Sequence, residues 1–282
     1  MALILLSTLL IPSLSHAIPL SFSAPACTKS LLDSTASSYL TAQTLGTPNT
    51  LTPLLSPSFT YLENNVNSTL TKSLLTKPLS IAHTRTIHDL LTCASYTELI
   101  APNNTTPYVI GTQIRLIADG ESGDWKIASL DTIATTTGAW LFNASKTLEY
   151  VLKETWTPLS ASLQSPRSVL IAAGDAYLDM WSNSTADKAV PWGTPCVRLE
   201  GSAYTGTGKA DDSCKPGIPS NHNQKPNTRR RYVVDEEMGS VSIFCVWEHM
   251  MNAADSHEFR LEGGKLRYVH TMTECGGKVC KL

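Results

Sequence analysis

The amino-acid sequence contains one ordered set of short motifs twice, in residues 36–132 and again in residues 174–272. Partner motifs lie 137 to 146 residues apart, so their order is kept and only the loop lengths differ. A repeat of about 140 residues has the size of a domain and exceeds a solenoid unit of roughly 20–50 residues. We therefore predict two tandem copies of one small α+β domain. The partner motifs are Ser38-Tyr39-Leu40 and Ala176-Tyr177-Leu178, Leu62-Glu63-Asn64 and Leu199-Glu200-Gly201, Arg85-Thr86-Ile87-His88-Asp89 and Arg231-Tyr232-Val233-Val234-Asp235, Ile114-Arg115-Leu116 and Phe259-Arg260-Leu261, and Asp131-Thr132-Ile133 and His270-Thr271-Met272.

Composition excludes several classes of partner. A length of 282 residues suits about two domains. A hydrophobic content of 42% with 16% charged residues is typical of a globular protein with a real core. The net charge of −2 gives no support for binding to nucleic acid or to an anionic membrane. We expect neither as a partner.

The first residues are typical of a secretory signal peptide. Residues 1–17 carry no charged side chain, and the apolar stretch from Leu3 to Leu14 is too short to span a membrane. Ser15-His16-Ala17 fits the small-x-Ala cleavage rule, with Ala24 and Ala26 as alternatives. No later segment is long and apolar enough for a span, so we expect a secreted, soluble protein. Five sequons agree with secretion and are candidate glycosylation sites: Asn67, Asn103, Asn104, Asn143 and Asn183.

Seven cysteines would meet an oxidising environment in a secreted protein, and the odd number leaves at least one unpaired. Cys27 and Cys93 are the predicted pair of the first copy. In the second copy we expect a bond among Cys196, Cys214 and Cys275, without a fixed choice. Cys245 sits in an apolar strand and is the candidate for a buried free thiol. No C-x-x-C motif occurs, which argues against a structural zinc site.

Each copy reads as an opening helix, a proline-rich bend, a short strand and then further strands. The long polar segment 201–228 of the second copy is predicted to be a lid or an excursion tied by a disulfide. The joining segment contains Trp140, Phe142 and Trp156 and is expected to pack between the domains. The predicted boundaries are 27–134 for the first domain, 135–165 for the connecting segment, 166–275 for the second domain and 276–282 for a C-terminal tail.

Near the end of the chain, the Gly263-Gly264 pair between alternating strands predicts a two-residue hairpin turn. This turn would place His257 directly opposite His270 on one face, among apolar side chains. The first copy has Thr112 and Asp131 at these two positions. Imidazoles exchange protons near neutral pH, so the pair is a candidate acid–base site that only the second copy has. The predicted cross-strand pairs are Leu261 with Leu266, Phe259 with Tyr268, and His257 with His270.

The order of elements in each copy resembles the nuclear-transport-factor-like, or SnoaL-like, α+β cone of scytalone dehydratase, ketosteroid isomerase and polyketide cyclases. More narrowly, the chain is similar to a family of secreted fungal proteins with an uncharacterised domain. The superfamily resemblance implies a pocket between the helices and the concave sheet face, often used for proton transfer without a cofactor. The similar strings are Tyr61-Leu62-Glu63-Asn64, Trp140-Leu141-Phe142-Asn143, Arg230-Arg231-Tyr232-Val233-Val234-Asp235, Asp255-Ser256-His257-Glu258-Phe259-Arg260 and Gly264-Lys265-Leu266-Arg267-Tyr268-Val269-His270-Thr271.

One functional hypothesis is a cofactor-free lyase, isomerase or cyclase that acts on a small, mostly apolar molecule, such as a polyketide- or terpenoid-type metabolite. His257 and His270 would serve as base and acid. Asp235 would orient one imidazole, and Tyr232 or Tyr268 would donate to a developing oxyanion. The expected substrate-binding residues are Trp247, Phe259, Leu261, Leu266 and Glu200.

An alternative is a secreted binding or host-interaction protein that holds a small molecule without chemistry. A third possibility is a metal site formed by His257, His270 and an acid such as Asp255 or Asp235. No H-x-H or H-E-x-x-H motif supports it, and we expect no cofactor. The two domains could pack as a pseudo-dimer within one chain, which predicts a monomer.

Overall fold

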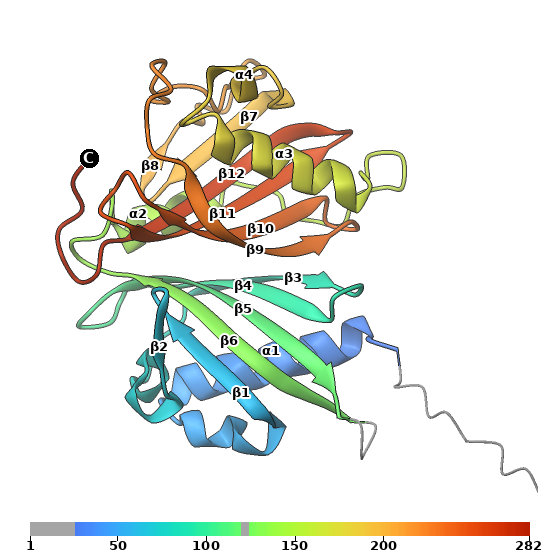
Figure 1. Ribbon diagram of the computed structural model, residues 1–282, viewed down its shortest axis with the longest axis vertical. Helices are drawn as coiled ribbons and strands as arrows, with labels where there is room; N and C mark the ends of the chain where they lie inside the picture. Colours follow the sequence, from blue (N-terminus) through green and yellow to red (C-terminus); the bar gives the residue numbers. More distant parts are fainter. Residues whose placement is uncertain (1–25, 120–123) are drawn as a thin grey trace, which may run out of the picture.

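The computed structural model describes residues 26–119 and 124–282 and contains two six-stranded sheets, one in each half of the chain (Figure 1). The predicted signal peptide, residues 1–17, lies outside the described residues. The first sheet consists of β1 (Leu55–Glu63), β2 (Val66–Ser68), β3 (His83–Asp89), β4 (Ala94–Ala101), β5 (Tyr108–Ala118) and β6 (Trp125–Thr135). The second consists of β7 (Trp192–Glu200), β8 (Ala203–Tyr204), β9 (Asn227–Asp235), β10 (Ser240–Trp247), β11 (Ala253–Glu262) and β12 (Lys265–Glu274). The α-helices are α1 (Lys29–Leu45), α2 (Ala144–Val151), α3 (Arg167–Asp179) and α4 (Ser184–Asp187), and the short 3-10 helices are η1 (Pro48–Leu54), η2 (Leu70–Lys72) and η3 (Leu74–Thr76).

Both sheets have the same topology. The strand order is β2-β1-β6-β5-β4-β3 in the first and β8-β7-β12-β11-β10-β9 in the second. Neighbouring strands are antiparallel except for one pair in each sheet, β1 with β6 and β7 with β12, which run parallel. The prediction of an α+β protein with two sheet-based domains is confirmed, and the repeat in the sequence is the repeat of this topology.

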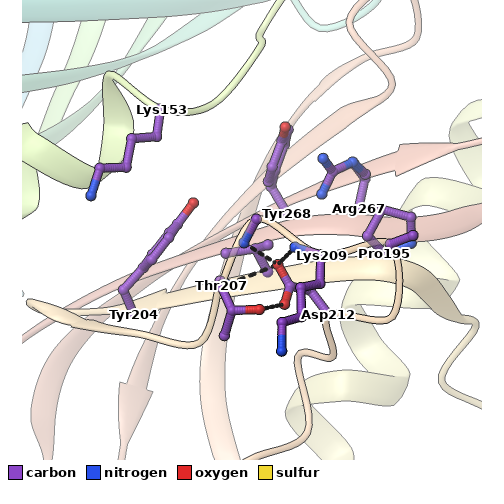
Figure 2. Close-up of a pocket in the computed structure, with 12 residues that line it drawn as sticks. Lys153, Pro195, Tyr204, Thr207, Lys209, Asp212, Arg267 and Tyr268 are labelled. Atoms are coloured by element: carbon purple, nitrogen blue, oxygen red, sulfur yellow. Dashed lines mark hydrogen bonds between the residues drawn. The ribbon is translucent and has the colours of Figure 1, made fainter.

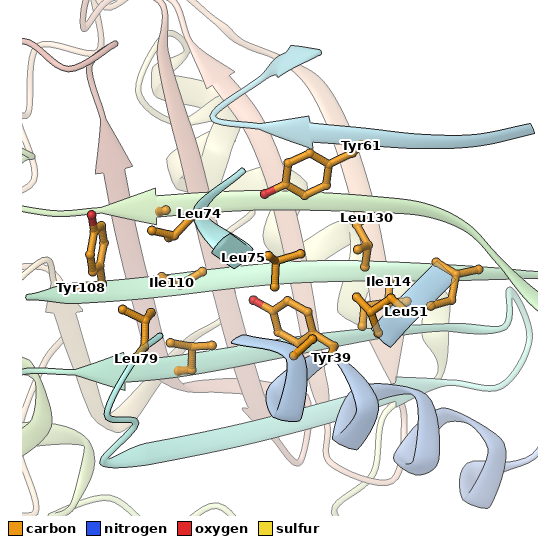
Figure 3. Close-up of a cluster of buried hydrophobic side chains, with 14 of the residues drawn as sticks. Tyr39, Leu51, Tyr61, Leu74, Leu75, Leu79, Tyr108, Ile110, Ile114 and Leu130 are labelled. Carbon is orange, nitrogen blue, oxygen red and sulfur yellow. The ribbon is translucent and has the colours of Figure 1, made fainter. Parts of the chain in front are cut away.

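In the first domain, α1 lies across the face of the sheet that points away from the second domain (Figure 1). The hydroxyl of Thr28 accepts a hydrogen bond from the N–H of Leu31 at the start of the helix, and Gly46 ends it with a φ of 67°. Buried apolar side chains fill the space between α1 and the sheet (Figure 3). They include Tyr39, Leu51, Tyr61, Leu74, Leu75, Leu79, Tyr108, Ile110, Ile114 and Leu130.

In the second domain, α3 takes the corresponding place against β9, β10 and β11 (Figure 1). The helix comes so close to the sheet that a Cβ atom on Gly174 would lie 2.5 Å from the Cδ1 of Ile243. A larger residue here would force the end of the Ile243 side chain to move. Leu170, Ala173 and Tyr177 on the same side of α3 are buried against the sheet.

The two sheets pack against each other through the faces opposite those that α1 and α3 cover (Figure 1). A separate buried cluster joins them, and it includes Ile87, Tyr96 and Ile133 of the first domain with Val233, Phe244 and Met272 of the second. The Tyr96 and Phe244 rings meet edge to face, with centroids 5.9 Å apart. This apolar contact joins the two domains within the chain.

Two aspartates from the repeated motif bind reciprocally across this interface. Asp89 accepts a hydrogen bond of 3.0 Å from the N–H of Val234, and Asp235 accepts one of 2.8 Å from the N–H of His88. Each aspartate also holds its own β-turn, through the N–H of Thr92 or of Met238. Asp235 therefore has a structural role, and its carboxylate does not orient either His257 or His270.

The connecting segment contacts both domains. Trp140 donates a hydrogen bond of 2.7 Å to Glu200 of the second domain. Trp156 stacks on Tyr268, with ring centroids 5.3 Å apart, and the guanidinium of Arg85 from the first domain lies 3.6 Å from the centroid of its ring. The segment thus occupies the seam between the domains, as its aromatic content predicts.

Three disulfides are present. Cys27–Cys93 is confirmed, and Cys196 pairs with Cys214, which ties the long polar segment of the second domain to β7. The bond expected among Cys196, Cys214 and Cys275 is thus the one between the first two, and Cys275 pairs with Cys280 of the C-terminal tail. Cys245 is buried and unpaired, as predicted.

Candidate functional site

The β11–β12 hairpin contains a β-bulge between Arg260 and Leu261 that changes the predicted register. Beyond the bulge, His257 lies opposite Thr271 and not opposite His270. Side chains alternate between the faces of a strand, so a shift of one residue places His257 and His270 on opposite faces of the sheet. The predicted histidine pair is therefore wrong. The observed pairs are Leu261 with Leu266, as predicted, Arg260 with Tyr268, and Phe259 with Val269.

His270 lies at the interface between the domains and not in a pocket. Its Nδ1 is 3.1 Å from Glu98 of the first domain, and its Nε2 is 2.6 Å from Glu154 of the connecting segment. Burial lowers the pKa of His270, but the two carboxylates outweigh it and raise the pKa to about 10. The positively charged His270 therefore joins three parts of the chain through its ion pairs. It cannot exchange protons with His257, because the two side chains lie on opposite faces of the sheet.

The protein should become less stable at alkaline pH, because His270 then loses its proton and its ion pairs. The folded-state pKa of His270 is raised to about 10, so its stabilisation is complete below the unfolded pKa of about 6.5 and is lost as the pH rises through the folded value. We expect the free energy of unfolding to fall by up to about 1.4 kcal/mol per pH unit within that window. Urea titrations from pH 6 to 10 would test this. The His270→Gln variant should lack this component, and an identical slope in the variant would contradict the assignment.

His257 lies on the opposite, helix-covered face of the second sheet and lines a small buried cavity. The cavity has room for about one water molecule, because the space open to the centre of a water is about 10 Å³. Its walls are largely aromatic, and Tyr177 reaches it from α3. The lining residues are Tyr177, Trp181, Glu200, Asn227, Trp247, His257 and Thr271.

Asp255, two residues before His257, shares its face of β11. The Nδ1 of His257 lies 3.0 Å from Oδ2 of Asp255, and both side chains are buried. This contact is electrostatic, because the Nδ1 of His257 has no hydrogen-bond partner of good geometry among the described residues. Thr273 donates a hydrogen bond of 2.7 Å to the second oxygen of Asp255 and fixes the carboxylate. The result is a buried imidazole next to a fixed carboxylate beside a cavity, two groups that general-base catalysis can use.

Cys245 completes a cluster with Asp255 and His257, in which one potential ligand atom of each lies within 4.8 Å of the others. Among the described residues, this cluster is the group that could hold a metal ion. However, burial and the nearby Asp255 raise the pKa of the Cys245 thiol well above its usual value. A metal would require the thiolate. The neutral thiol instead lies 3.4 Å from Oδ2 of Asp255, to which it donates a hydrogen bond.

Three further polar groups meet at the cavity. Oδ1 of Asn227 and Oγ1 of Thr271 are buried and have no hydrogen-bond partner among the described residues. Burial raises the pKa of Tyr177 to about 12, so this phenol remains a neutral hydrogen-bond donor at ordinary pH. Buried polar atoms without partners are costly and mark places where a ligand or water can bind.

The first domain has no equivalent of the Cys245–Asp255–His257 cluster at the corresponding positions of its sheet. Equivalent strand positions there carry Leu99, Ile110 and Thr112 in place of the Cys245–Asp255–His257 cluster. The hydroxyl of Thr112 is bonded to Tyr39 at 2.7 Å, within the filled core described above. The same topology therefore builds an apolar core in one copy and a polar cluster beside a cavity in the other.

The remaining predicted site residues lie in several places. Glu200 and Trp247 line the cavity together with His257. The Phe259 ring stacks beside that of His257, with centroids 5.7 Å apart, whereas Leu261 and Leu266 lie within the core. Tyr232 is engaged with Asp175 at 2.8 Å, and Tyr268 faces the connecting segment. Tyr177, Asn227 and Thr271 were not predicted as site residues. Asp255 was predicted only as a metal ligand, although it precedes His257 by two residues and a spacing of two places both side chains on one face of a strand.

Comparison with known proteins finds one matching family model and no activity. The model, described as a domain of unknown function (DUF8021), matches residues 163–273, which cover α3, β7 to β11, most of β12 and the candidate site. No curated protein matches the chain. Among the described residues, no helix is long and apolar enough to cross a membrane.

Proposed function

We propose that the chain is a secreted, cofactor-independent lyase, isomerase or cyclase that uses His257 as a general base on a small, mostly apolar carbonyl compound. We also propose that both domains are nuclear-transport-factor-like cones, in which the helix-covered concave face is the usual place for such a site. The observation that supports the proposal is the buried His257–Asp255 pair beside an aromatic cavity, at positions that are apolar or bonded to the core in the first domain.

The proposed chemistry is a proton transfer next to a carbonyl group. The free Nε2 of His257 would take the proton, and Asp255 would stabilise the imidazolium that forms. The neutral phenol of Tyr177 would donate a hydrogen bond to the developing oxyanion. Trp181 and Trp247 would keep water away from the reacting atoms, which strengthens each of these interactions.

Substrate entry requires the cover of the cavity to move, because the closed form has room for about one water. Gln224 stabilises the closed form through two hydrogen bonds to tryptophans that line the cavity. Its backbone N–H donates to the carbonyl of Trp181 at 3.1 Å, and its side chain accepts from Nε1 of Trp247 at 2.8 Å. The disulfide-tied segment that carries Gln224 is thus the candidate gate, and opening it breaks these hydrogen bonds to two tryptophans that line the cavity.

The test is proton exchange, which needs no knowledge of the natural product. Small apolar ketones such as 2-tetralone and 2-cyclohexenone would be incubated with the secreted protein in D₂O, and deuterium uptake followed by NMR. We expect His257→Gln to slow enzyme-dependent uptake by about 100- to 10,000-fold. Asp255→Asn should slow it less, since it removes only the orienting charge.

The matched control is His249→Gln, which removes an exposed histidine at the end of the neighbouring strand β10 and should leave the rate unchanged. Equal exchange in the wild type and the His257 variant would overturn the proposal. Saturable ketone binding without exchange would instead favour the alternative, a secreted small-molecule-binding protein. That alternative is supported by the enclosed, aromatic lining of the same cavity.

Secretion is part of the proposal, and it predicts N-linked glycans. The three disulfides fit an extracellular protein. Asn67, Asn103, Asn143 and Asn183 are exposed, and Asn104 is half-buried. We expect peptide-N-glycosidase to increase the gel mobility of protein secreted from a eukaryotic host. Mobility that does not change would contradict the prediction, and Asn→Gln variants would identify the occupied sites.

A further inference from the structure

A second, open pocket lies in the second domain on the far side of the sheet from His257. It is formed by β7, β8, the loop 205–212 and β12, together with the end of α2, and has a volume of about 460 Å³ (Figure 2). Lys153, Lys209 and Arg267 bring three positive charges to its wall, and Asp212 brings one carboxylate. The proposed enzyme function uses none of these residues.

The oxygens of the Asp212 carboxylate are already engaged in hydrogen bonds within their own loop. It accepts hydrogen bonds from the backbone N–H groups of Thr207, Gly208 and Lys209, at 2.8, 3.0 and 3.3 Å, and from the hydroxyl of Thr207 (Figure 2). The hydrogen bond from the Thr207 hydroxyl is the main cause of a lowered pKa of Asp212. Backbone N–H groups arranged in this way form a nest for an anion, and here the chain supplies that anion itself.

The positive charges lack such partners. Among the described residues, neither Lys209 nor Arg267 forms an ion pair, and Nη1 of Arg267 is buried without a hydrogen-bond partner. The guanidinium of Arg267 lies over the ring of Tyr268 at 4.2 Å, which fixes its plane. Lys153 is paired with Glu149, but the contact is exposed and therefore weak. The pocket thus presents an ordered guanidinium and a nearby ammonium without a matching anion.

The pocket is pre-organised. The Cys196–Cys214 disulfide ties its loop to β7, and the N–H of Cys196 donates to the carbonyl of Asp212 at 2.8 Å. Gly206 packs on the ring of Tyr204 so closely that a Cβ atom would lie 2.6 Å from it. Pro195 and Val197 add apolar surface to the lining. A rigid site of this kind binds with little loss of conformational entropy.

We propose that this pocket binds a small organic anion, with a carboxylate or phosphate held by Arg267 and Lys209 and an apolar body against Pro195, Val197 and Tyr204. Guanidinium groups match planar carboxylates and phosphates through two parallel hydrogen bonds, and Arg267 lines the pocket. The site is independent of the cavity at His257, because it lies on the other face of the sheet and shares no lining residue with it.

The test uses calorimetric titration of the full secreted chain with three probes: salicylate, its neutral analogue salicylamide, and inorganic phosphate. We expect saturable binding of salicylate, no detectable binding of salicylamide, and affinity that falls with added salt. Lys209→Gln changes an exposed side chain and should weaken salicylate binding several-fold. The double variant Lys209→Gln/Arg267→Gln should weaken it at least tenfold.

Lys225→Gln is the matched control, because it removes one exposed positive charge outside the pocket and should leave the affinity unchanged. Equal binding of salicylate and salicylamide, or equal binding by the double variant and the control, would overturn the proposal. Phosphate that binds as tightly as salicylate would support the anion site and overturn the contribution of the apolar body. Absence of saturable binding at millimolar salicylate would overturn both.

Discussion

Replacement of Arg85 by leucine will lower the free energy of unfolding by about 3–5 kcal/mol, because it leaves the buried carboxylate of Glu258 without an ion-pair partner and that of Glu98 with His270 alone. Arg85 pairs with Glu258 of the second domain at 2.5 Å and with Glu98 of its own domain at 3.2 Å. The side chain of Glu258 is 0% exposed and that of Glu98 is 2% exposed. Water does not reach these buried carboxylates, so the loss of Arg85 leaves the cost of their desolvation uncompensated.

The wider network makes the loss larger than that of a single ion pair. Arg85 also lies over Trp156, and Glu98 binds His270, so the first domain, the connecting segment and the second domain meet at one charged cluster. Burial raises the pKa of Glu98, but Arg85 and His270 outweigh it and hold the pKa well below its usual value. Without Arg85, this carboxylate should become easier to protonate.

Denaturant unfolding of the two proteins would measure the difference. The matched control is Lys29→Leu, which removes one partner of an ion pair of similar length, Lys29–Glu237, whose side chains are 44% and 50% exposed. We expect this control to cost less than about 1 kcal/mol. Similar losses for both variants would show that the buried cluster contributes no more than a surface pair, and the prediction would be wrong.

Removal of the Cys27–Cys93 disulfide is the second change with a large expected effect. The bond joins the residue before α1 to the turn between β3 and β4, across a sequence separation of 66. Closure of a loop of that length in the unfolded chain corresponds to about 4 kcal/mol in the chain-entropy relation. The Cys27→Ser/Cys93→Ser variant should therefore unfold at lower denaturant concentration, and α1 should be released first from the first sheet.

The chain offers its own control for this effect. The Cys275–Cys280 bond spans a separation of 5, for which the same relation yields about 2 kcal/mol. Thermal and denaturant unfolding of both double-serine variants would compare the two bonds under non-reducing conditions. Equal losses, or a larger loss for Cys275→Ser/Cys280→Ser, would mean that loop length does not govern the contribution of these disulfides.

Several features were predictable because they depend on neighbouring residues or on repetition. The two-residue turn at Gly263-Gly264 is a local preference of the backbone, and the structure has it between β11 and β12. The repeat determined that two domains share one topology, since similar patterns of apolar residues fold alike. Cys245 was predicted to be buried from its place in an apolar strand, and it is.

The tertiary structure alone decided which polar side chains meet. A bulge between Arg260 and Leu261 depends on how β12 packs, and it moved His270 to the interface while His257 kept its place at the cavity. The Arg85–Glu258 and His270–Glu154 ion pairs join residues more than 100 positions apart. Such contacts form only after the two sheets have docked. Sequence therefore determined the elements and their repetition, which follow from local backbone preferences and apolar periodicity. Packing decided the chemistry, because one residue of register is enough to exchange one face of a strand for the other.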